Sequence, residues 1–472
     1  MPVSAEWVLV AVQVGLAGIA AGFAVARRRG PHGTLAWLFA IVAFPLVGPL
    51  AYFALANPHI SRPKRRKIQA AERVRGENPP AAAPPEAVFG TPAVRSVLKG
   101  MTRATLLPPT TGNQVTLLTD NVAAFAAKEL AIREAKHSVW AEYYSLHDDA
   151  TGRRFLEALR ARAAEGVEVR LLVDAVGSHD IDEASVARLR AAGGRVEAFH
   201  PVNPLRRRWS VHLRNHRKVL VVDGAIGFVG GMNIGDRYAG SGRRRSLRWR
   251  DTHLRIEGPA ARDLARVFDE DWCFMTGECL RLADAAPAKG NTTVAVLPSG
   301  PDQPENAAAL AWFSCIGLAV ERCWLTTPYF APNSAILTAL TSAARRGVDV
   351  RLLVPVRTDL WLMDLVNRSF YPALVEAGVR VFEYQPAFVH AKTLVADTEL
   401  SFIGSANVDI RSFQLNFEAG AVIADPGFAG QMERQFLADL EESREVSVGA
   451  VRRGSVWAAA SQGAAQVLAP LL

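Results

Sequence analysis

Two similar α/β halves behind a pair of apolar N-terminal helices are the fold that the 472-residue sequence predicts. Three observations lead to this prediction. Two long uncharged runs fill the first sixty residues, strand-like and helix-like stretches alternate from about residue 113 onward, and one short motif occurs twice at equivalent places. Each half should form a mixed sheet flanked by helices. With 50% of its residues apolar, the chain can bury more than one core.

The N-terminal runs at residues 7–26 and 35–56 carry no charge. Each reaches the roughly 20 residues that are needed to cross the hydrocarbon core of a bilayer. A cleaved signal peptide carries its positive charge before the apolar run, whereas here three arginines at 27–29 follow it. We therefore predict a membrane hairpin of two transmembrane helices in residues 1–60, with a buried helix pair of a soluble protein as the alternative.

The basic residues beside the hairpin predict its orientation. Five lysines and arginines in residues 62–67 follow the second run and predict that the rest of the chain lies in the cytoplasm. The three arginines of the connecting loop argue for the opposite orientation, and we give the larger cluster more weight. Pro45 and Pro49 lie inside the second run and leave room for a kinked or re-entrant segment.

Composition divides the rest of the chain into four segments. Residues 61–112 are basic and then proline-rich, which predicts a linker with an extended stretch at 78–92. We expect the first α/β domain in residues 113–285 and the second in residues 286–445. The final segment, 446–472, is apolar and alanine-rich, and forms either a helix in the membrane interface or one packed on the body.

An internal repeat supports the two halves. Gly-Val-Glu-Val-Arg-Leu-Leu-Val at 166–173 recurs as Gly-Val-Asp-Val-Arg-Leu-Leu-Val at 347–354, each time after a helix pattern. Later in each half comes the block His-x-Lys-x4-Asp-x6-Gly-(Gly/Ser)-x-Asn, at 216–233 and again at 390–407. Two copies at the same place of a repeated unit are very hard to attribute to chance.

The repeated block supplies groups that suit a phosphodiester. Residues i and i+2 of an extended chain project from the same face, so the histidine and lysine of each copy point together. The small residues let backbone pass close by, and the asparagine offers its amide to the same cleft. Two copies that face each other make a complete phosphate site. The candidate residues are His216, Lys218, Asp223 and Asn233 in the first copy, and His390, Lys392, Asp397 and Asn407 in the second.

These groups predict phosphoryl transfer by two histidines. One neutral imidazole attacks phosphorus to give a phosphohistidine, the protonated other donates its proton to the leaving alcohol, and the roles then reverse. A histidine pKa near 6.5 allows opposite protonation states near neutrality. Lys218, Lys392, Asn233 and Asn407 would disperse the charge on the phosphate oxygens. We expect neither a metal nor another cofactor, because no carboxylate cluster is apparent and the lysines already carry positive charge.

The duplicated block resembles the phospholipase D superfamily, and further stretches resemble the bacterial cardiolipin synthases within it. The resemblance covers essentially the whole chain, including the two apolar runs and the last five residues. The stretches that carry it are Arg214-Asn-His-Arg-Lys218, Gly231-Met-Asn-Ile-Gly-Asp236, Trp249-Arg-Asp-Thr-His253, Thr327-Pro-Tyr-Phe330 and Ser405-Ala-Asn-Val-Asp-Ile-Arg-Ser-Phe-Gln-Leu-Asn-Phe-Glu418.

This resemblance implies two pseudo-symmetric phospholipase D-type sandwich domains that convert two phosphatidylglycerol molecules to cardiolipin and glycerol. It implies that Asp251 and Glu418 orient the histidines, and that Asp223 and Asp397 hold the fold rather than touch substrate. The resemblance leaves the attacking histidine open, and we favour His216. It also implies a multi-pass protein of the bacterial inner membrane with anionic phospholipids as partners.

Two other activities use the same chemistry. With water as the acceptor, the reaction becomes that of a hydrolytic phospholipase D, and the motifs do not separate alcohol from water. The net charge of +8 also suits a phosphodiester nuclease. The apolar runs and the family-specific stretches favour transfer between lipids, and a tether to the bilayer argues against nucleic acid as a partner.

Several features remain open between a functional and a structural interpretation. Basic clusters at 206–208 and 243–250 either gather anionic lipid or form solvated loops. Tyr144, Tyr329 and Phe330 follow equivalent strands and are candidates for lining a lipid channel, with core packing as the alternative for Phe330. We interpret the four cysteines as reduced core residues, with a disulfide or a structural metal as the alternative. They are Cys273, Cys279, Cys315 and Cys323.

Overall fold

The computed structural model divides the chain into two compact units, Met1–Pro63 and Lys64–Leu472. The structure describes residues 5–26, 31–53, 61–80, 90–201, 213–240, 249–303, 305–447, 449 and 461–466. The arginines at 27–29, the basic clusters at 206–208 and 243–248, and most of the C-terminal segment predicted at 446–472 lie outside the described residues.

The N-terminal unit is a helical hairpin whose second arm is broken. Its helices are α1 (Ala5–Ala26), α2 (Pro31–Ala43) and α3 (Val47–Ala51). The interruption between α2 and α3 falls beside Pro45, where proline limits a continuous helix. The Tyr52 ring packs edge-on against Trp37, with ring centroids 5.5 Å apart. Among the helices that the structure describes, none combines the length and the apolar character of a membrane span.

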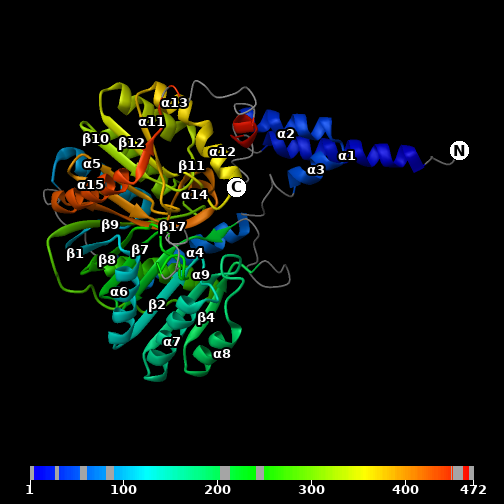
Figure 1. Cartoon of the computed structure of the whole chain (residues 1–472). Coiled ribbons are helices and arrows are strands. Elements are labelled where there is room, and N and C mark those ends of the chain that lie inside the picture. Colours follow the sequence, from blue (N-terminus) through cyan, green and yellow to red (C-terminus); the bar gives the residue numbers. More distant parts are fainter. Residues whose placement is uncertain are drawn as a thin grey trace. The chain divides into compact units, whose positions relative to one another are not determined.

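One continuous mixed sheet runs through the body (Figure 1). Its strands are β1 (Thr110–Leu118), β2 (Ser138–Tyr143), β3 (Glu168–Asp174), β4 (Arg195–Phe199), β5 (Arg214–Asn215), β6 (Lys218–Val222), β7 (Ile226–Gly230), β8 (His253–Glu257), β9 (Thr292–Ser299), β10 (Arg322–Thr326), β12 (Asp349–Pro355), β13 (Arg380–Tyr384), β14 (Thr393–Ala396), β15 (Leu400–Gly404), β17 (Asn416–Ala424) and β18 (Ser443–Glu445). Their order is β18-β13-β12-β10-β14-β15-β17-β9-β1-β8-β7-β6-β2-β3-β4, and β5 pairs with β17. The short strands β11 (Phe330–Ala331) and β16 (Val408–Asp409) form a separate pair.

The strand order confirms the predicted pseudo-symmetry. The central strands β1 and β9 pair antiparallel, and each half continues outward with a mixed set. The parallel trio β2, β3 and β4 in the first half corresponds to β10, β12 and β13 in the second. The two histidine blocks likewise form equivalent antiparallel hairpins, β6–β7 and β14–β15.

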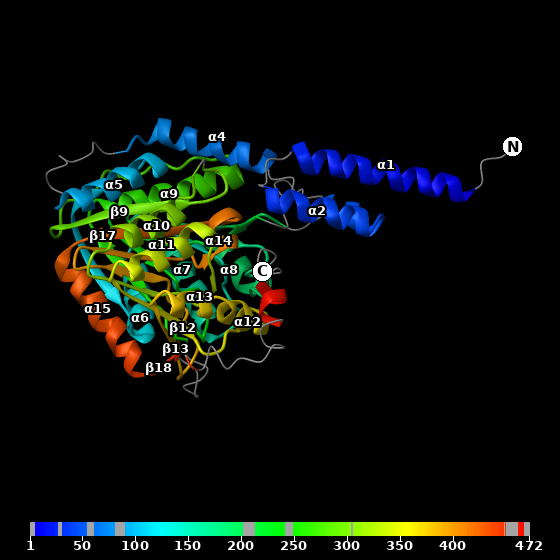
Figure 2. The same cartoon turned by 90° about the horizontal axis from the view of Figure 1, so that it is seen from above.

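Helices cover both faces of the sheet. They are α4 (Ser61–Glu77), which begins at the unit boundary, α5 (Pro92–Thr105), α6 (Asn121–Glu134), α7 (Ala150–Ala164), α8 (Glu183–Ala191), α9 (Ala260–Thr276), α10 (Ala307–Leu318), α11 (Ser334–Arg345), α12 (Trp361–Ser369), α13 (Tyr371–Glu376), α14 (Ile410–Gln414) and α15 (Pro426–Glu441). In the view of Figure 2, α5 and α9 lie in the upper part of the body and α6 and α15 in the lower part, and α10 packs against α5 and β9. The two halves therefore share one sheet but have separate helix-covered cores.

The eight-residue repeat forms β3 in one half and β12 in the other. The acidic residue of each copy accepts a hydrogen bond from a tryptophan indole on the neighbouring strand, Trp140 to Glu168 and Trp324 to Asp349, both at 3.0 Å. Each strand follows a helix through a glycine with positive φ, such as Gly166 at 87°. A side chain there would strain the backbone, which explains why both copies begin with glycine.

The prediction of a plain linker at 61–112 is wrong, because this segment contains α4 and α5 and both pack on the body. Lys67 on α4 is fully buried, and its Nζ lies 2.8 Å from a carboxylate oxygen of Asp271 on α9. The apolar face of α5 joins the core of the second half around Trp312. The proline-rich stretch at 81–89 lies outside the described residues.

The expectation of four reduced cysteines is wrong for one pair. Cys273 and Cys279 form a disulfide, whereas Cys315 and Cys323 are buried thiols. Helix α9 ends at Gly277, whose positive φ of 86° turns the chain back and brings the two Cα atoms to 4.6 Å. This separation is within the range of disulfides. Neither C-x-x-C nor zinc spacing marks such a turn in the sequence.

Candidate active site

Both histidine blocks reach a single cavity of about 250 Å³ in the body. His216 comes from the first half and His390 from the second, so the convergence on which the predicted chemistry depends is present. The cavity is lined by Tyr144, Arg214, His216, Asn233, Tyr238, Trp249, Tyr329, Asp359, Leu360, His390, Asn407, Asp409, Arg411 and Asn416.

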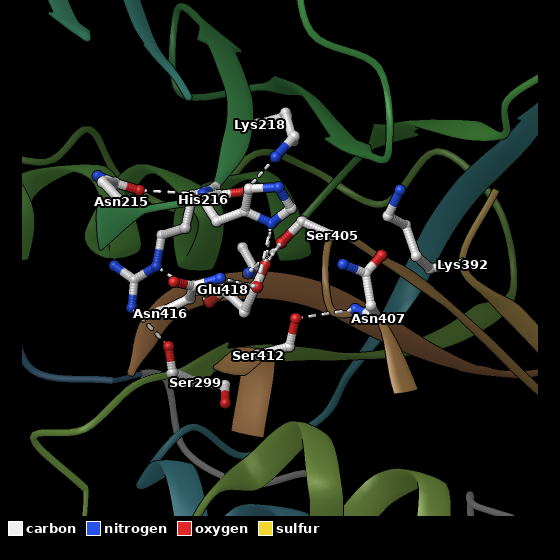
Figure 3. Close-up of polar contacts among 12 residues, drawn as sticks. Asn215, His216, Lys218, Ser299, Lys392, Ser405, Asn407, Ser412, Asn416 and Glu418 are labelled. Atoms are coloured by element: carbon white, nitrogen blue, oxygen red, sulfur yellow. Dashed lines mark hydrogen bonds and ion pairs between the residues drawn. The ribbon is translucent and has the colours of Figure 1, made fainter. Parts of the chain in front are cut away.

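A carboxylate from the opposite half holds each histidine at Nδ1. Glu418 on β17 lies 2.9 Å from Nδ1 of His216, and Figure 3 shows this pair with Lys218 beside the ring. Asp251, which precedes β8, lies 2.7 Å from Nδ1 of His390. Such a carboxylate selects the tautomer that carries a proton on Nδ1. Nε2 of each imidazole is then the atom with a lone pair for chemistry.

Main-chain hydrogen bonds also join each histidine to the opposite half. The His216 N–H donates to the carbonyl of Phe417, the residue before Glu418, at 2.8 Å. The His390 N–H donates in the same way to the carbonyl of Arg250, the residue before Asp251, at 2.7 Å. Each histidine is therefore positioned by the other half through both its main chain and its ring. Neither half contains a complete site.

The two carboxylates are supported differently. The Ser405 hydroxyl donates to Glu418 at 2.5 Å and accepts a hydrogen bond from the Ala419 N–H. At the equivalent position of the first half stands Gly231, where a Cβ would lie 2.2 Å from a carboxylate oxygen of Asp251. Asp251 is one methylene shorter than Glu418, and its close approach to the backbone leaves room for glycine alone.

The two lysines lie behind the cavity rather than on its wall. Lys218 and Lys392 are buried, and each ammonium donates to the carbonyl of the histidine in its own block. The Lys218 Nζ also lies 5.3 Å from the centre of the Tyr144 ring. In this arrangement their charges act on a bound anion over a short distance without solvent screening.

The two asparagines line the cavity as predicted, but they have different partners. Asn233 accepts from the Ser145 N–H at 3.1 Å and donates to the Tyr238 hydroxyl at 3.0 Å. The side-chain oxygen of Asn407 is buried and has no hydrogen-bond partner in the described part of the chain. Asn233 is therefore held in place by its neighbours, whereas Asn407 keeps a polar atom for a ligand.

Asp223 and Asp397 lie outside the cavity, so their place in the predicted catalytic set is wrong. Each occupies the turn after a block strand with a positive φ, 52° and 47°. The Asp223 carboxylate accepts three backbone N–H groups at the start of β2, at residues 136–138. Asp397 accepts those at the start of β10, at residues 320–322. Both residues hold the sheet together, as the family resemblance implied.

Aromatic rings surround the imidazoles. The Tyr144 ring centre lies 4.9 Å from that of His216, and the Trp249 and Tyr238 ring centres lie 5.1 and 5.5 Å from that of His390. Tyr144 and Tyr329 line the cavity, which keeps both as candidates for contact with a lipid. Phe330 is fully buried in the core of the second half, which favours the packing alternative for that residue.

Burial lowers the pKa of both imidazoles. The pKa of His216 falls to about 4, because burial and the Lys218 charge outweigh the attraction of Glu418. The pKa of His390 falls to about 3 through burial and Lys392, against Asp251. Burial also lowers the pKa of Lys392 to about 8. In the ligand-free site both histidines are thus neutral near pH 7, whereas the sequence predicted opposite protonation states.

Comparisons with known proteins agree with this geometry. Residues 130–272 and 313–440 match a family model described as "Cardiolipin synthase, PLD-like domain". The chain is 36% identical to a cardiolipin synthase of Geobacillus kaustophilus, over 94% of this chain and 90% of that one. It is 38% identical to cardiolipin synthase A of Pseudomonas aeruginosa, over 93% and 90%. The chain belongs to the cardiolipin synthase family.

Two further matches concern parts of the fold. Residues 16–56, within the hairpin unit, match the family model "Phospholipase_D-nuclease N-terminal". Among solved structures, the phosphatidylserine synthase of Haemophilus influenzae aligns with a TM-score of 0.57 at 14% identity, over 76% of this chain and 95% of that one. This second match shows a shared fold. In this cardiolipin synthase-family chain, each of the two matched phospholipase D-like segments contains one histidine block.

The cavity also contains residues to which sequence reasoning gave no role. Asp409, Arg411 and Asn416 stand inside the stretch that carries the cardiolipin synthase resemblance, so their position in that stretch was the available signal. Asp359 and Leu360 lie in a loop before α12 and had no such signal. No group of three or more His, Cys, Asp or Glu side chains in the described ranges is arranged to hold a metal ion.

Replacing Gly231 by Ala is expected to lower turnover by about 10²-fold while substrate binding changes little. The new methyl group displaces Asp251 and therefore turns the His390 ring that Asp251 holds. Steady-state kinetics with matched thermal unfolding would measure this effect. The control is Ser405→Gly, which removes a side chain instead of adding one and should cost less. Equal turnover of Gly231→Ala and the wild type would contradict the role assigned to this close contact.

The lowered histidine pKa values predict that acid weakens the fold. In the unfolded chain both imidazoles gain a proton near pH 6.5, but in the folded protein they do so only near pH 4 and pH 3. Between pH 6.5 and 4 the unfolded state binds more protons, so stability rises with pH. This contribution is complete above pH 6.5 and is lost as the pH falls towards the folded values.

The variant His216→Asn/His390→Asn should therefore lose less stability in acid than the wild type. We expect a difference on the order of 1 kcal/mol per histidine between about pH 7.5 and about pH 5.5. Denaturant unfolding at the two pH values measures it. Parallel losses in the two proteins would mean that these imidazoles are not held neutral by the fold.

Proposed function

We propose that this protein transfers a phosphatidyl group from one phosphatidylglycerol to another and so produces cardiolipin and glycerol. The observation that supports this most is the pair of imidazoles on one cavity, each bound at Nδ1 by a buried carboxylate. Both Nε2 atoms remain for reaction. Membership of the cardiolipin synthase family supports the choice of a lipid alcohol as acceptor.

In the first half-reaction, Nε2 of His216 attacks the phosphorus of the donor lipid. The bond from phosphorus to the glycerol head group breaks, and His390 in its protonated form donates a proton to the leaving glycerol oxygen. The bound diester brings a negative charge into a cavity in which both imidazoles are otherwise neutral, and this charge favours a proton on His390. Lys218 and Lys392 offset the charge that develops on the phosphate oxygens.

In the second half-reaction the roles reverse. Neutral His390 takes the proton from a head-group hydroxyl of the second phosphatidylglycerol, and that oxygen attacks phosphorus as the bond to Nε2 of His216 breaks. The products are cardiolipin, a neutral His216 and a His390 that carries the proton while an anionic diester occupies the cavity. The aromatic walls around both rings limit the access of water, which would otherwise divert the phosphohistidine to phosphatidic acid.

The N-terminal unit is proposed to hold the enzyme in the bacterial inner membrane as a multi-pass anchor, with the catalytic body in the cytoplasm. Large apolar side chains are exposed on it, such as Phe39 at 74% and Val42 at 76%. Such a surface is unfavourable in water and suits a lipid environment. The basic residues at 62–67 support the cytoplasmic orientation.

The test is to incubate the detergent-solubilised full-length chain with phosphatidylglycerol and to identify the lipid products by mass spectrometry. Cardiolipin and glycerol in equal amounts are expected. Phosphatidic acid without cardiolipin would assign the protein to hydrolysis instead. A parallel incubation with single-stranded DNA tests the nuclease alternative, for which no cleavage is expected.

A further inference from the structure

The size of the catalytic cavity limits how a lipid can enter it. Its volume of about 250 Å³ is smaller than the roughly 300–1,000 Å³ of pockets that enclose a drug-sized ligand. A phospholipid with two acyl chains is larger than such a ligand. The cavity can therefore hold a phosphate and its head group, while the acyl chains must stay outside. The question is then which surface at its mouth meets these chains.

A strip of aromatic side chains leads from one catalytic histidine toward the surface. The Phe388 ring centre lies 5.7 Å from that of His390 and 6.3 Å from that of Tyr329. The Tyr329 hydroxyl then donates to the carboxylate of Asp359, which belongs to the loop before α12. The strip thus connects the reacting centre with this loop through ring contacts and one hydrogen bond.

The loop ends in two adjacent exposed apolar residues. Leu360 lines the cavity and is 46% exposed, and Trp361, the first residue of α12, is 74% exposed. Among the described residues of the body, no other pair of sequence neighbours exposes two large apolar side chains. Arg357 is exposed in the same loop, and Arg411 lines the same cavity. Asp359 is exposed in that loop as well, so the apolar pair rather than net charge is what suits the head-group layer of a bilayer.

We propose that the Leu360–Trp361 tip lies in the head-group layer of the bilayer and holds the mouth of the cavity against it. A phosphatidyl head group then enters along the Phe388–Tyr329 strip while its acyl chains stay in the membrane. This inference rests on the proposed function in that it takes a bilayer lipid as the substrate. Tryptophan is suited to this position because its ring is amphipathic and prefers the interface.

Site-specific fluorescence on the full-length chain in phosphatidylglycerol vesicles tests this placement. Trp361→Cys is labelled with an environment-sensitive fluorophore, and the vesicles carry acyl chains brominated near the head group. The native cysteines interfere little, because Cys315 and Cys323 are buried and the other two form a disulfide. The label is expected to be quenched by the brominated chains and to shift its emission to shorter wavelength.

Val320→Cys is the matched control. Val320 is 76% exposed, close to the value for Trp361. It lies before the first residue of β10, whereas Tyr329 lies after the last, so the two residues are near opposite ends of that strand. A label at 320 should be quenched weakly. Equal quenching at 320 and 361, or quenching at neither, would overturn the proposal. This readout needs no turnover, so quenching at 361 alone without cardiolipin formation would support the placement and overturn the proposed function.

Kinetics give a second measure. Trp361→Ser should raise the apparent KM for phosphatidylglycerol in vesicles by about tenfold, since an interfacial tryptophan contributes that much affinity. Val320→Ser should leave it unchanged. An unchanged KM in Trp361→Ser would overturn a contribution of the tip to lipid capture.

Discussion

Replacing either His216 or His390 by Ala is expected to lower cardiolipin formation by at least about 10³-fold without unfolding the protein. Each variant removes an imidazole that the mechanism needs in both half-reactions. The carboxylate left behind keeps other partners, since Glu418 still accepts from Ser405 and Asn416. Product analysis by mass spectrometry, with thermal unfolding as the control for folding, measures the effect.

A substrate with an activated leaving group separates the two roles. A phosphatidyl ester of nitrophenol needs no general acid, because nitrophenolate leaves without a proton. His390→Ala should therefore release one nitrophenol per enzyme and then stop at the phosphohistidine on His216. His216→Ala should release none.

The opposite pattern, a burst in His216→Ala and none in His390→Ala, would exchange the two assignments. Normal cardiolipin formation in either variant would remove that histidine from the mechanism. The nitrophenol burst and acid-quench detection of labelled phosphohistidine must agree, because both report the same covalent step.

The internal repeat was enough to predict the architecture of the body. Repeated residues occupy repeated strands, and the equivalence extends to single hydrogen bonds such as those of Trp140 and Trp324. A repeat of this kind predicts which positions are equivalent because both copies fold into the same arrangement of strands and helices. It also placed both histidines at the same point of each half, and the cavity confirms that they meet.

The repeat could not predict that each histidine is bound by a carboxylate from the other half. Asp251 and Glu418 occupy equivalent positions, and family resemblance implied that they orient histidines. Nothing in the spacing tells whether a carboxylate serves the histidine of its own half or of the other. That choice depends on how the halves join across β1 and β9, which is a long-range property of the sheet.

Other features that the sequence did not predict have local structural causes. Composition predicted a linker at 61–112 because charge and proline outweighed the apolar face of α5, which becomes visible only when Trp312 is placed beneath it. The Cys273–Cys279 disulfide depends on the reversal at Gly277. Leu360 and Trp361 were missed because their loop and α12 have no sequence counterpart in the first half, so the repeat carried no information about them.

A buried network of charged side chains next to the first histidine block predicts a large loss of stability on mutation. Arg217, between His216 and Lys218, extends its guanidinium to α9 and β17. There it donates to Asp271 at 2.6 Å and to the carbonyl of Glu418 at 3.0 Å. The second oxygen of Asp271 lies 2.8 Å from the ammonium of Lys67. One carboxylate on α9 thus neutralises two fully buried cations.

Asp271→Asn is expected to reduce the free energy of unfolding by about 3–5 kcal/mol, because the buried Arg217 loses its paired carboxylate and Lys67 is left with Glu270 at 4.0 Å. Burial is the largest cause that raises the pKa of the nearby Glu142 well above its usual range, and it still acts in the variant, so we expect Glu142 to replace Asp271 only in part. Denaturant unfolding at pH 7 measures the loss. Glu157→Gln, at an exposed pair with Arg160, is the control and should change nothing measurable.

Lys67→Met should cost less than Asp271→Asn, because Asp271 then keeps Arg217 and no unpaired charge is left in the core. The order of the two variants is the informative result. If Lys67→Met were as damaging, α4 itself would be the main support of this region rather than the balance of charge. Turnover should follow the same order, since Arg217 ties the chain beside His216 to the backbone of Glu418. In Asp271→Asn we expect kcat to fall further than KM rises, because this network positions a reacting group and does not contact the lipid.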